Sequence, residues 1–126
     1  PLIRMTGSIT SLQVLDALAA LADPIRGRLL LALERHELAV GEMAAALQLP
    51  QSTVSRDLKT LVDAGLVGAR ADGASRRYRL VGAGSGGPAR KLWAAVRDGI
   101  ADLPAAAHDH ERLRAVLAER RSATRA

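Results

Sequence analysis

The side chains best suited to recognise another molecule gather in the segment from Gln51 to Gly65. Its apolar residues recur at positions i, i+4, i+7 and i+8, which places them on one inward stripe of a helix. These are Val54, Leu58, Leu61 and Val62. The opposite face carries amide, hydroxyl and cationic side chains, the types that hydrogen-bond base edges and phosphates: Gln51, Ser52, Thr53, Ser55, Arg56 and Lys59. The pattern indicates either a DNA-recognition helix or the solvated face of an ordinary helical hairpin.

A shorter amphipathic segment precedes this helix, because Met43, Ala46 and Leu47 also keep helical spacing. The break at 48–50 separates the two segments, and Gly65 ends the second one as a C-terminal glycine does. Two helices joined by a tight turn predict a helix-turn-helix.

A basic hairpin is predicted directly after this pair of helices. Two strand-like runs, 66–70 and 75–81, lie on either side of Asp72-Gly73, and Asp-Gly between such runs is a strong hairpin signal. In the returning strand Arg77 and Arg79 share one face, while Tyr78 and Leu80 share the other. The arginines expected to grip a DNA backbone are Arg76, Arg77 and Arg79. The alternative is a surface hairpin with solvated arginines, which the order of helix, turn, helix and hairpin disfavours.

With these motifs in place, the stretch 21–81 resembles the winged helix-turn-helix of the ArsR/SmtB family of bacterial repressors. The matching pieces are Leu21-Ala22-Asp23-Pro24-Ile25-Arg26, Thr53-Val54-Ser55, Leu58-Lys59-x-Leu61 and Ala64-Gly65-Leu66-Val67. The resemblance implies a mainly α fold with a small β-hairpin wing, dimerising through its N- and C-terminal helices. It also implies a transcription regulator whose DNA affinity is switched by a small molecule or a metal ion.

Further helices flank the predicted winged domain. The first spans 9–22, and Asp23 and Pro24 begin the second as N-cap and first residue, which then runs to about His36. Residues 1–81 therefore form the DNA-binding domain with its N-terminal dimerisation helix. The glycine-rich stretch 82–87 reads as a linker.

Residues 88–126 are expected to form C-terminal dimerisation and extension helices. Leu92, Val96 and Ile100 make an apolar stripe in a helix that Pro104 breaks, and a last helix covers about 109–121. We expect the arginines of that last helix to lie largely away from its apolar side: Arg112, Arg114, Arg120 and Arg121. The stripe is too thin for a separate core, so it packs either back on the domain or across a two-fold axis with the first helix.

Composition agrees with a DNA partner. The 126 residues carry a formal net charge of +5, which favours a polyanion. There is no cysteine, so neither a disulfide nor a thiolate metal site can form. No apolar stretch approaches the ~20 residues needed to span a bilayer, and we expect a cytoplasmic protein with no membrane partner.

Metal binding is where the sequence departs from the family. Many members carry a Cys-x-Cys pair where this chain has Ala39 and Gly41, neither of which has a ligating side chain. Imidazole and carboxylate donors at His108, His110 and Glu111 would suit Zn or Ni. The alternative is a solvated cap at a helix start, since acidic side chains are favourable there.

The sequence thus predicts a homodimeric transcriptional regulator that acts as a repressor and binds a palindromic operator in double-stranded DNA. It predicts no enzymatic activity. The carboxylate of Asp57 is awkward in a recognition helix, because it must accept from a cytosine, pair with an arginine or repel the DNA. Pro50 stands where relatives often have a capping serine. An alternative function is a protein-interaction module, such as the head of a larger methyltransferase-containing protein, since 91–121 looks like the connector in such relatives.

Overall fold

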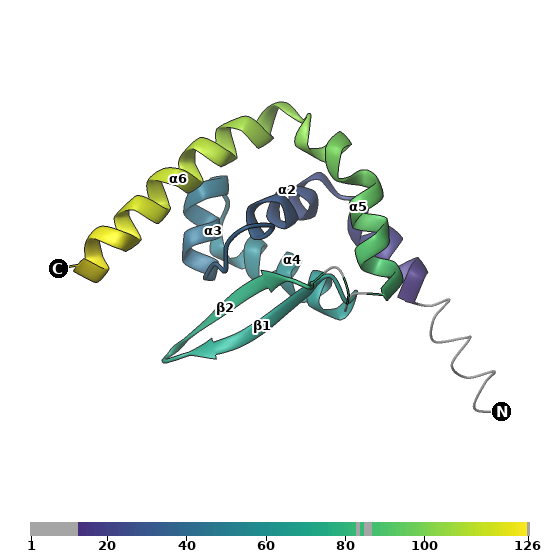
Figure 1. Ribbon diagram of the computed structural model, residues 1–126, viewed down its shortest axis with the longest axis horizontal. Coiled ribbons are helices and arrows are strands. Elements are labelled where there is room, and N and C mark those ends of the chain that lie inside the picture. Colours follow the sequence, from purple (N-terminus) through teal and green to yellow (C-terminus); the bar gives the residue numbers. More distant parts are fainter. Residues whose placement is uncertain (1–12, 83, 85–86, 126) are drawn as a thin grey trace.

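The computed structural model describes residues 13–82, 84 and 87–125 (Figure 1). A helix over residues 13–21 comes first. It is followed by α2 (Pro24–Leu33), α3 (Val40–Leu47), α4 (Gln51–Asp63), β1 (Val67–Asp72), β2 (Ser75–Leu80), α5 (Gly87–Ala101) and α6 (Pro104–Arg125). The predicted mainly α fold with a small hairpin is confirmed. The start of the first predicted helix, residues 9–12, and linker positions 83, 85 and 86 lie outside the described residues.

The core is built from leucine and alanine, as a chain with few aromatic residues requires. Helices α2, α3 and α4 meet around Leu30, Met43 and Leu58, all fully buried. The single tryptophan, Trp93 of α5, is also fully buried in this core. The predicted stripe of α4 is confirmed at Val54, Leu58 and Leu61, but Val62 is 37% exposed, so its assignment to the core was wrong.

Asp23 begins α2 as predicted. Its carboxylate accepts hydrogen bonds from the backbone N–H groups of Ile25 at 2.8 Å and Arg26 at 3.2 Å. The helix ends at Leu33 rather than near His36, and a turn and a bend at residues 34–35 lead into the next segment. Leu38 there exchanges two backbone hydrogen bonds with Tyr78 of β2, at 3.0 and 2.9 Å. The wing is therefore tied to the start of α3.

The helix-turn-helix and the hairpin follow the predicted local signals. Gln48 ends α3 in the left-handed region with φ of 54°, and Pro50 precedes α4 without a side-chain cap. Gly65 has φ of 80° directly after α4, a conformation that glycine adopts without steric cost. Strands β1 and β2 pair antiparallel from Val67↔Leu80 to Asp72↔Ser75, which leaves a two-residue loop.

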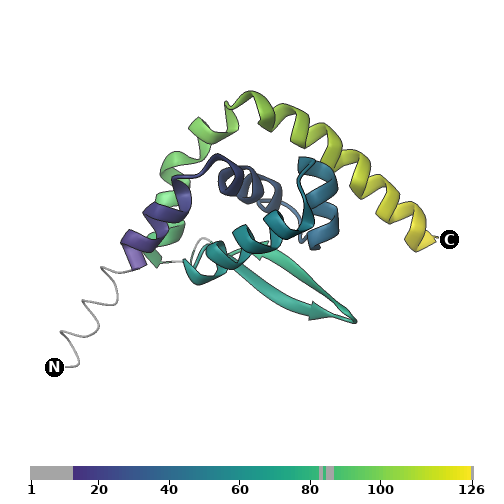
Figure 2. The same cartoon turned by 180° about the vertical axis from the view of Figure 1, so that it is seen from behind.

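Helices α5 and α6 form an arch over the domain, with α5 against α2 and α6 along α3 (Figures 1 and 2). Gly27 of α2 permits the first contact, because a Cβ there would lie 2.9 Å from Cγ2 of Ile100. Helix α6 begins at Pro104, earlier than predicted, and buries Leu113 in the common core. Its arginines do not all point away, since Arg112 and Arg120 both bind α3; that expectation was wrong for these two.

Candidate nucleic-acid interface

The outer face of α4 presents the polar side chains singled out in the sequence. Gln51, Ser52, Ser55, Arg56 and Lys59 are exposed, and Thr53 is half-buried. Among the described residues the guanidinium of Arg56 has no hydrogen-bond or ion-pair partner, whereas Lys59 forms an exposed pair with Asp63 at 2.9 Å. Such a surface pair is weak, so the cation stays available to another anion. The buried stripe beneath holds this face outward.

The carboxylate of Asp57 is turned inward. It is buried and lies 3.3 Å from Nη1 of Arg26 on α2. Arg26 also donates from Nε to the carbonyl of Ala20 at 2.8 Å and from Nη2 to that of Ala19 at 3.1 Å. Of the three fates considered for Asp57, pairing with an arginine is the one found. The pair joins α4, α2 and the end of the first helix.

The arginines of the wing differ in availability. Arg76 is exposed near the hairpin loop and has no ion-pair partner among the described residues, and Arg79 is 54% exposed, 3.9 Å from Glu37. Arg77 is only 23% exposed, because its guanidinium lies 2.6 Å from Asp72 and 3.3 Å from Glu42. The structure therefore places Arg76 and Arg79 open to a polyanion and Arg77 in an internal ion-pair network.

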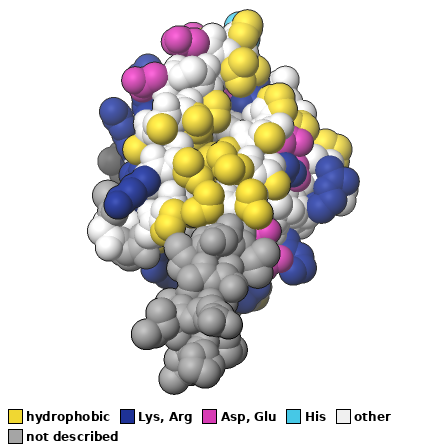
Figure 3. Space-filling model, turned by 90° about the vertical axis from the view of Figure 1, so that its right-hand side faces the viewer, with side chains coloured by type: hydrophobic (Ala, Val, Ile, Leu, Met, Phe, Trp, Pro, Cys, Tyr) yellow, Lys and Arg dark blue, Asp and Glu magenta, His cyan; other side chains and the backbone are white. Residues whose placement is uncertain are grey.

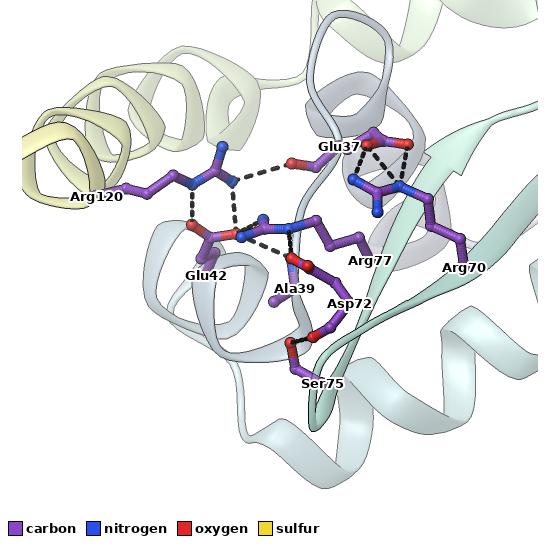
Figure 4. A network of polar contacts seen from close by, with 8 residues as sticks. All are labelled: Glu37, Ala39, Glu42, Arg70, Asp72, Ser75, Arg77 and Arg120. Carbon is purple, nitrogen blue, oxygen red and sulfur yellow. Dashed lines mark hydrogen bonds and ion pairs between the residues drawn. The ribbon is translucent and has the colours of Figure 1, made fainter. Parts of the chain in front are cut away.

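Figure 4 shows this network, which sequence reasoning missed. Glu42 accepts from the backbone N–H of Ala39 at 2.9 Å and from Arg120 of α6 at 2.5 and 2.6 Å. Nearby, Arg70 of β1 pairs with Glu37 at 2.8 Å. The bond from Ala39 to Glu42 is half of a capping box, and Glu three residues after a helix start is its sequence signal. The arginine partners carry no such local signal.

The carboxylates of the network are held in their charged form. Burial disfavours the charge on Glu42, but hydrogen bonds from Arg120 and Ala39 outweigh it and lower the pKa of Glu42. The hydrogen bond from Arg77 lowers the pKa of Asp72, and that from Arg70 lowers the pKa of Glu37. At neutral pH these three carboxylates are ionised and face the cations of Arg70, Arg77 and Arg120.

The expected metal donors do not converge within the chain. His108, His110 and Glu111 are exposed on α6, and the described residues include no group of three His, Cys, Asp or Glu side chains that could hold an ion. Asp109, between the histidines, is buried. Its carboxylate accepts from Arg28 at 2.7 and 2.8 Å and from Arg112 at 2.9 Å. Asp109 therefore holds α6 to the domain.

Known proteins share both sequence and fold with this chain. Residues 23–68 match the family model described as "Bacterial regulatory protein, arsR family". A solved homodimeric winged helix-turn-helix DNA-binding domain from Mycobacterium bovis, described as a possible ArsR-family regulator, is 33% identical with a TM-score of 0.61. It is matched over 72% of this chain and 82% of its own. This chain belongs to the ArsR/SmtB family. It is a winged helix-turn-helix protein of that family, whose members regulate transcription.

Two family relatives are repressors by description. The transcriptional repressor SmtB homolog of Synechocystis sp. is 43% identical over 68 residues, covering 54% of this chain and 52% of that protein. The HTH-type transcriptional repressor SmtB of Mycobacterium tuberculosis is 40% identical over 72 residues, covering 54% and 53%. The chain thus spans about half the length of these relatives. In the part that the structure describes, no helix has the length and apolar character to cross a membrane.

Proposed function

We propose that the chain is a transcriptional repressor that binds a palindromic operator as a homodimer. The observation that carries the proposal is the outward polar face of α4, fixed by its buried stripe beside an arginine-bearing hairpin. An α-helix fits the major groove, where base edges present distinct donor and acceptor patterns. The repressor descriptions of the Synechocystis and Mycobacterium relatives support the direction of regulation.

The side chains divide by the DNA group they would contact. Gln51, Ser52, Thr53, Ser55 and Arg56 lie toward the start of α4, which is the part of a recognition helix that approaches base edges. Lys59, one turn further along, would contact phosphate. In the wing, Arg76 and Arg79 would contact the backbone directly. Arg77 would join them only after leaving its carboxylate partners.

The proposed homodimer forms through an apolar surface patch. Leu15 and Leu18 of the first helix are 60% and 48% exposed, and Val96 of α5 is 38% exposed. Figure 3 looks onto this side and shows hydrophobic side chains gathered over these two helices. A contiguous apolar patch marks an interaction site. A second copy is the proposed occupant, because two recognition helices related by a two-fold axis double the contacts on a palindrome.

The experiment is selection of bound genomic fragments followed by titration of the selected duplex and a random duplex at physiological salt. A repressor of this kind prefers its operator by about 10³-fold or more. Equal affinity for both duplexes would contradict the proposal and favour a protein-interaction module. Repeating the selection with Zn, Ni, arsenite or a chelator tests for an effector, with His108, His110 and Glu111 as the proposed weak donors for Zn or Ni.

A further inference from the structure

One carboxylate, that of Glu42, is shared by the C-terminal helix and the wing. Its Oε1 lies 2.6 Å from Nη2 of Arg120 and 3.3 Å from Nη1 of Arg77, and its Oε2 lies 2.5 Å from Nε of Arg120 (Figure 4). Both guanidinium groups are therefore drawn to a single negative charge. The shorter contacts are those from α6.

Helix α6 is bonded along the length of α3. Arg112 donates from Nε to the carbonyl of Ala46 at 2.6 Å, at the C-terminal end of α3. Arg120 reaches the other end, where it binds Glu42 and donates to the carbonyl of Glu37 at 3.0 Å. Arg120 lies eight positions after Arg112, which corresponds to an advance of about 12 Å along the helix, the length of the eight-residue α3. The contact of α6 with α3 thus ends at the N-terminal end of α3, beside Arg77 of the wing.

We propose that Arg120 controls how firmly Glu42 holds Arg77 away from DNA, so that α6 sets the DNA affinity of the wing. The proposal rests on the proposed DNA-binding function. With Arg120 in place, most of the charge of Glu42 is engaged and the two cations repel each other, which eases the departure of Arg77 toward a phosphate. Without Arg120, both oxygens of Glu42 are open to Arg77, which then stays in the domain.

Asp72 does not transmit this effect, although it lies 2.6 Å from Arg77. Asp72 and Arg77 belong to the same hairpin, so their pair moves with the wing. Glu42 belongs to α3 and does not. Any event that lifts the end of α6 from α3 therefore weakens DNA binding through Glu42, with no direct contact between α6 and DNA.

The chain offers matched variants for the test. Arg120→Met removes the charge and keeps an apolar stem that covers the same surface. Arg121→Met removes a neighbouring exposed charge of α6 and controls for net charge. Arg112→Met weakens the other end of α6 without touching Glu42 and controls for loosening of the helix. Glu42→Gln removes the shared charge itself.

The first measurement needs no DNA: hydrogen exchange of the Arg77 Nη1–H₂ group, which donates to Glu42, followed by NMR. Arg120→Met should slow this exchange by about two- to fivefold, the range of a partly exposed ion pair. Glu42→Gln should accelerate it, and the Arg121 and Arg112 variants should leave it unchanged. Unchanged or faster exchange in Arg120→Met would overturn the proposal.

The second measurement is affinity for a random duplex in wild-type and Arg77→Met backgrounds, since a wing contact to phosphate does not depend on sequence. Arg120→Met should weaken binding about two- to fivefold more than Arg121→Met. In the Arg77→Met background the two variants should be equal, because the coupling needs Arg77. If Arg120→Met still weakens binding more than Arg121→Met in the Arg77→Met background, the inference is refuted. Failure of the proposed function would instead show as equal affinity for selected and random duplexes.

Discussion

Replacing Asp109 by asparagine removes one negative charge from the contact that holds α6 to the domain and keeps the size of the side chain. The carboxylate is 9% exposed and accepts three hydrogen bonds, from Arg28 of α2 and Arg112 of α6. Those two arginines also donate to the last carbonyls of α3, Leu47 and Ala46. One carboxylate therefore compensates two cations at the junction of three helices.

The magnitude follows from burial. Removing one partner of a buried ion pair costs about 3–5 kcal/mol, because a charge is left without compensation in a poorly solvated place. Arg28 is 15% exposed but Arg112 is 30% exposed, and water recovers part of the loss for the second. We therefore expect Asp109→Asn to lower the free energy of unfolding by about 2–4 kcal/mol. For a chain of this size that is a fall in Tm of about 8–16 °C.

The assay is unfolding followed by fluorescence of Trp93, which is the single tryptophan of the chain and is fully buried. Asp98→Asn is the matched control: Asp98 also pairs with an arginine at 2.9 Å, but its side chain is 93% exposed. An exposed pair contributes about 1 kcal/mol or less. If Asp109→Asn and Asp98→Asn destabilise equally, the central position given to Asp109 is wrong.

The arginines proposed to contact DNA, the apolar patch, the network carboxylates and the absence of thiols each give a further prediction. Arg56→Ala should weaken operator binding by about 1–3 kcal/mol and relax the preference at one base position. Arg76→Ala should lower the slope of log affinity against log salt concentration by about 1 per half-site. If duplex titrations show neither effect, the proposed interface is wrong. Leu18→Glu combined with Val96→Glu should give a monomer in sedimentation, and a wild-type monomer at micromolar concentration would contradict the dimer. Because the folded pKa of Glu42 is lowered from 4.5, its contribution to stability is present above pH 4.5 and is lost as pH falls through the lower folded value. Glu42→Gln should flatten that acid limb in Trp fluorescence, and an unchanged limb would show that other carboxyl groups dominate. Arsenite selects thiolates, so calorimetry should show no tight arsenite binding, and a stoichiometric tight site would refute the argument from absent cysteines.

Several features could be predicted from the sequence because their causes lie within a few residues of each other. The period of Val54, Leu58 and Leu61 determined which side of α4 is buried, and thereby which side chains face outward. The carboxylate of Asp23 reaches the N–H groups two and three residues on, so the start of α2 was determined locally. Asp-Gly at the hairpin loop acted in the same way, since it concerns adjacent residues.

Only the tertiary structure decided which charged side chains are free. Arg76, Arg77 and Arg79 look alike in the sequence, yet Arg77 meets Glu42, 35 positions away, while Arg76 has no ion-pair partner among the described residues. Asp109 stands between two histidines in the sequence, yet its partner Arg28 lies 81 positions away. Hydrophobic period and capping act over one or two helical turns, whereas an ion pair depends on how whole helices pack. The local rules therefore determined the fold class and the outward face of α4, whereas the packing of the helices and the hairpin decided which arginines form ion pairs.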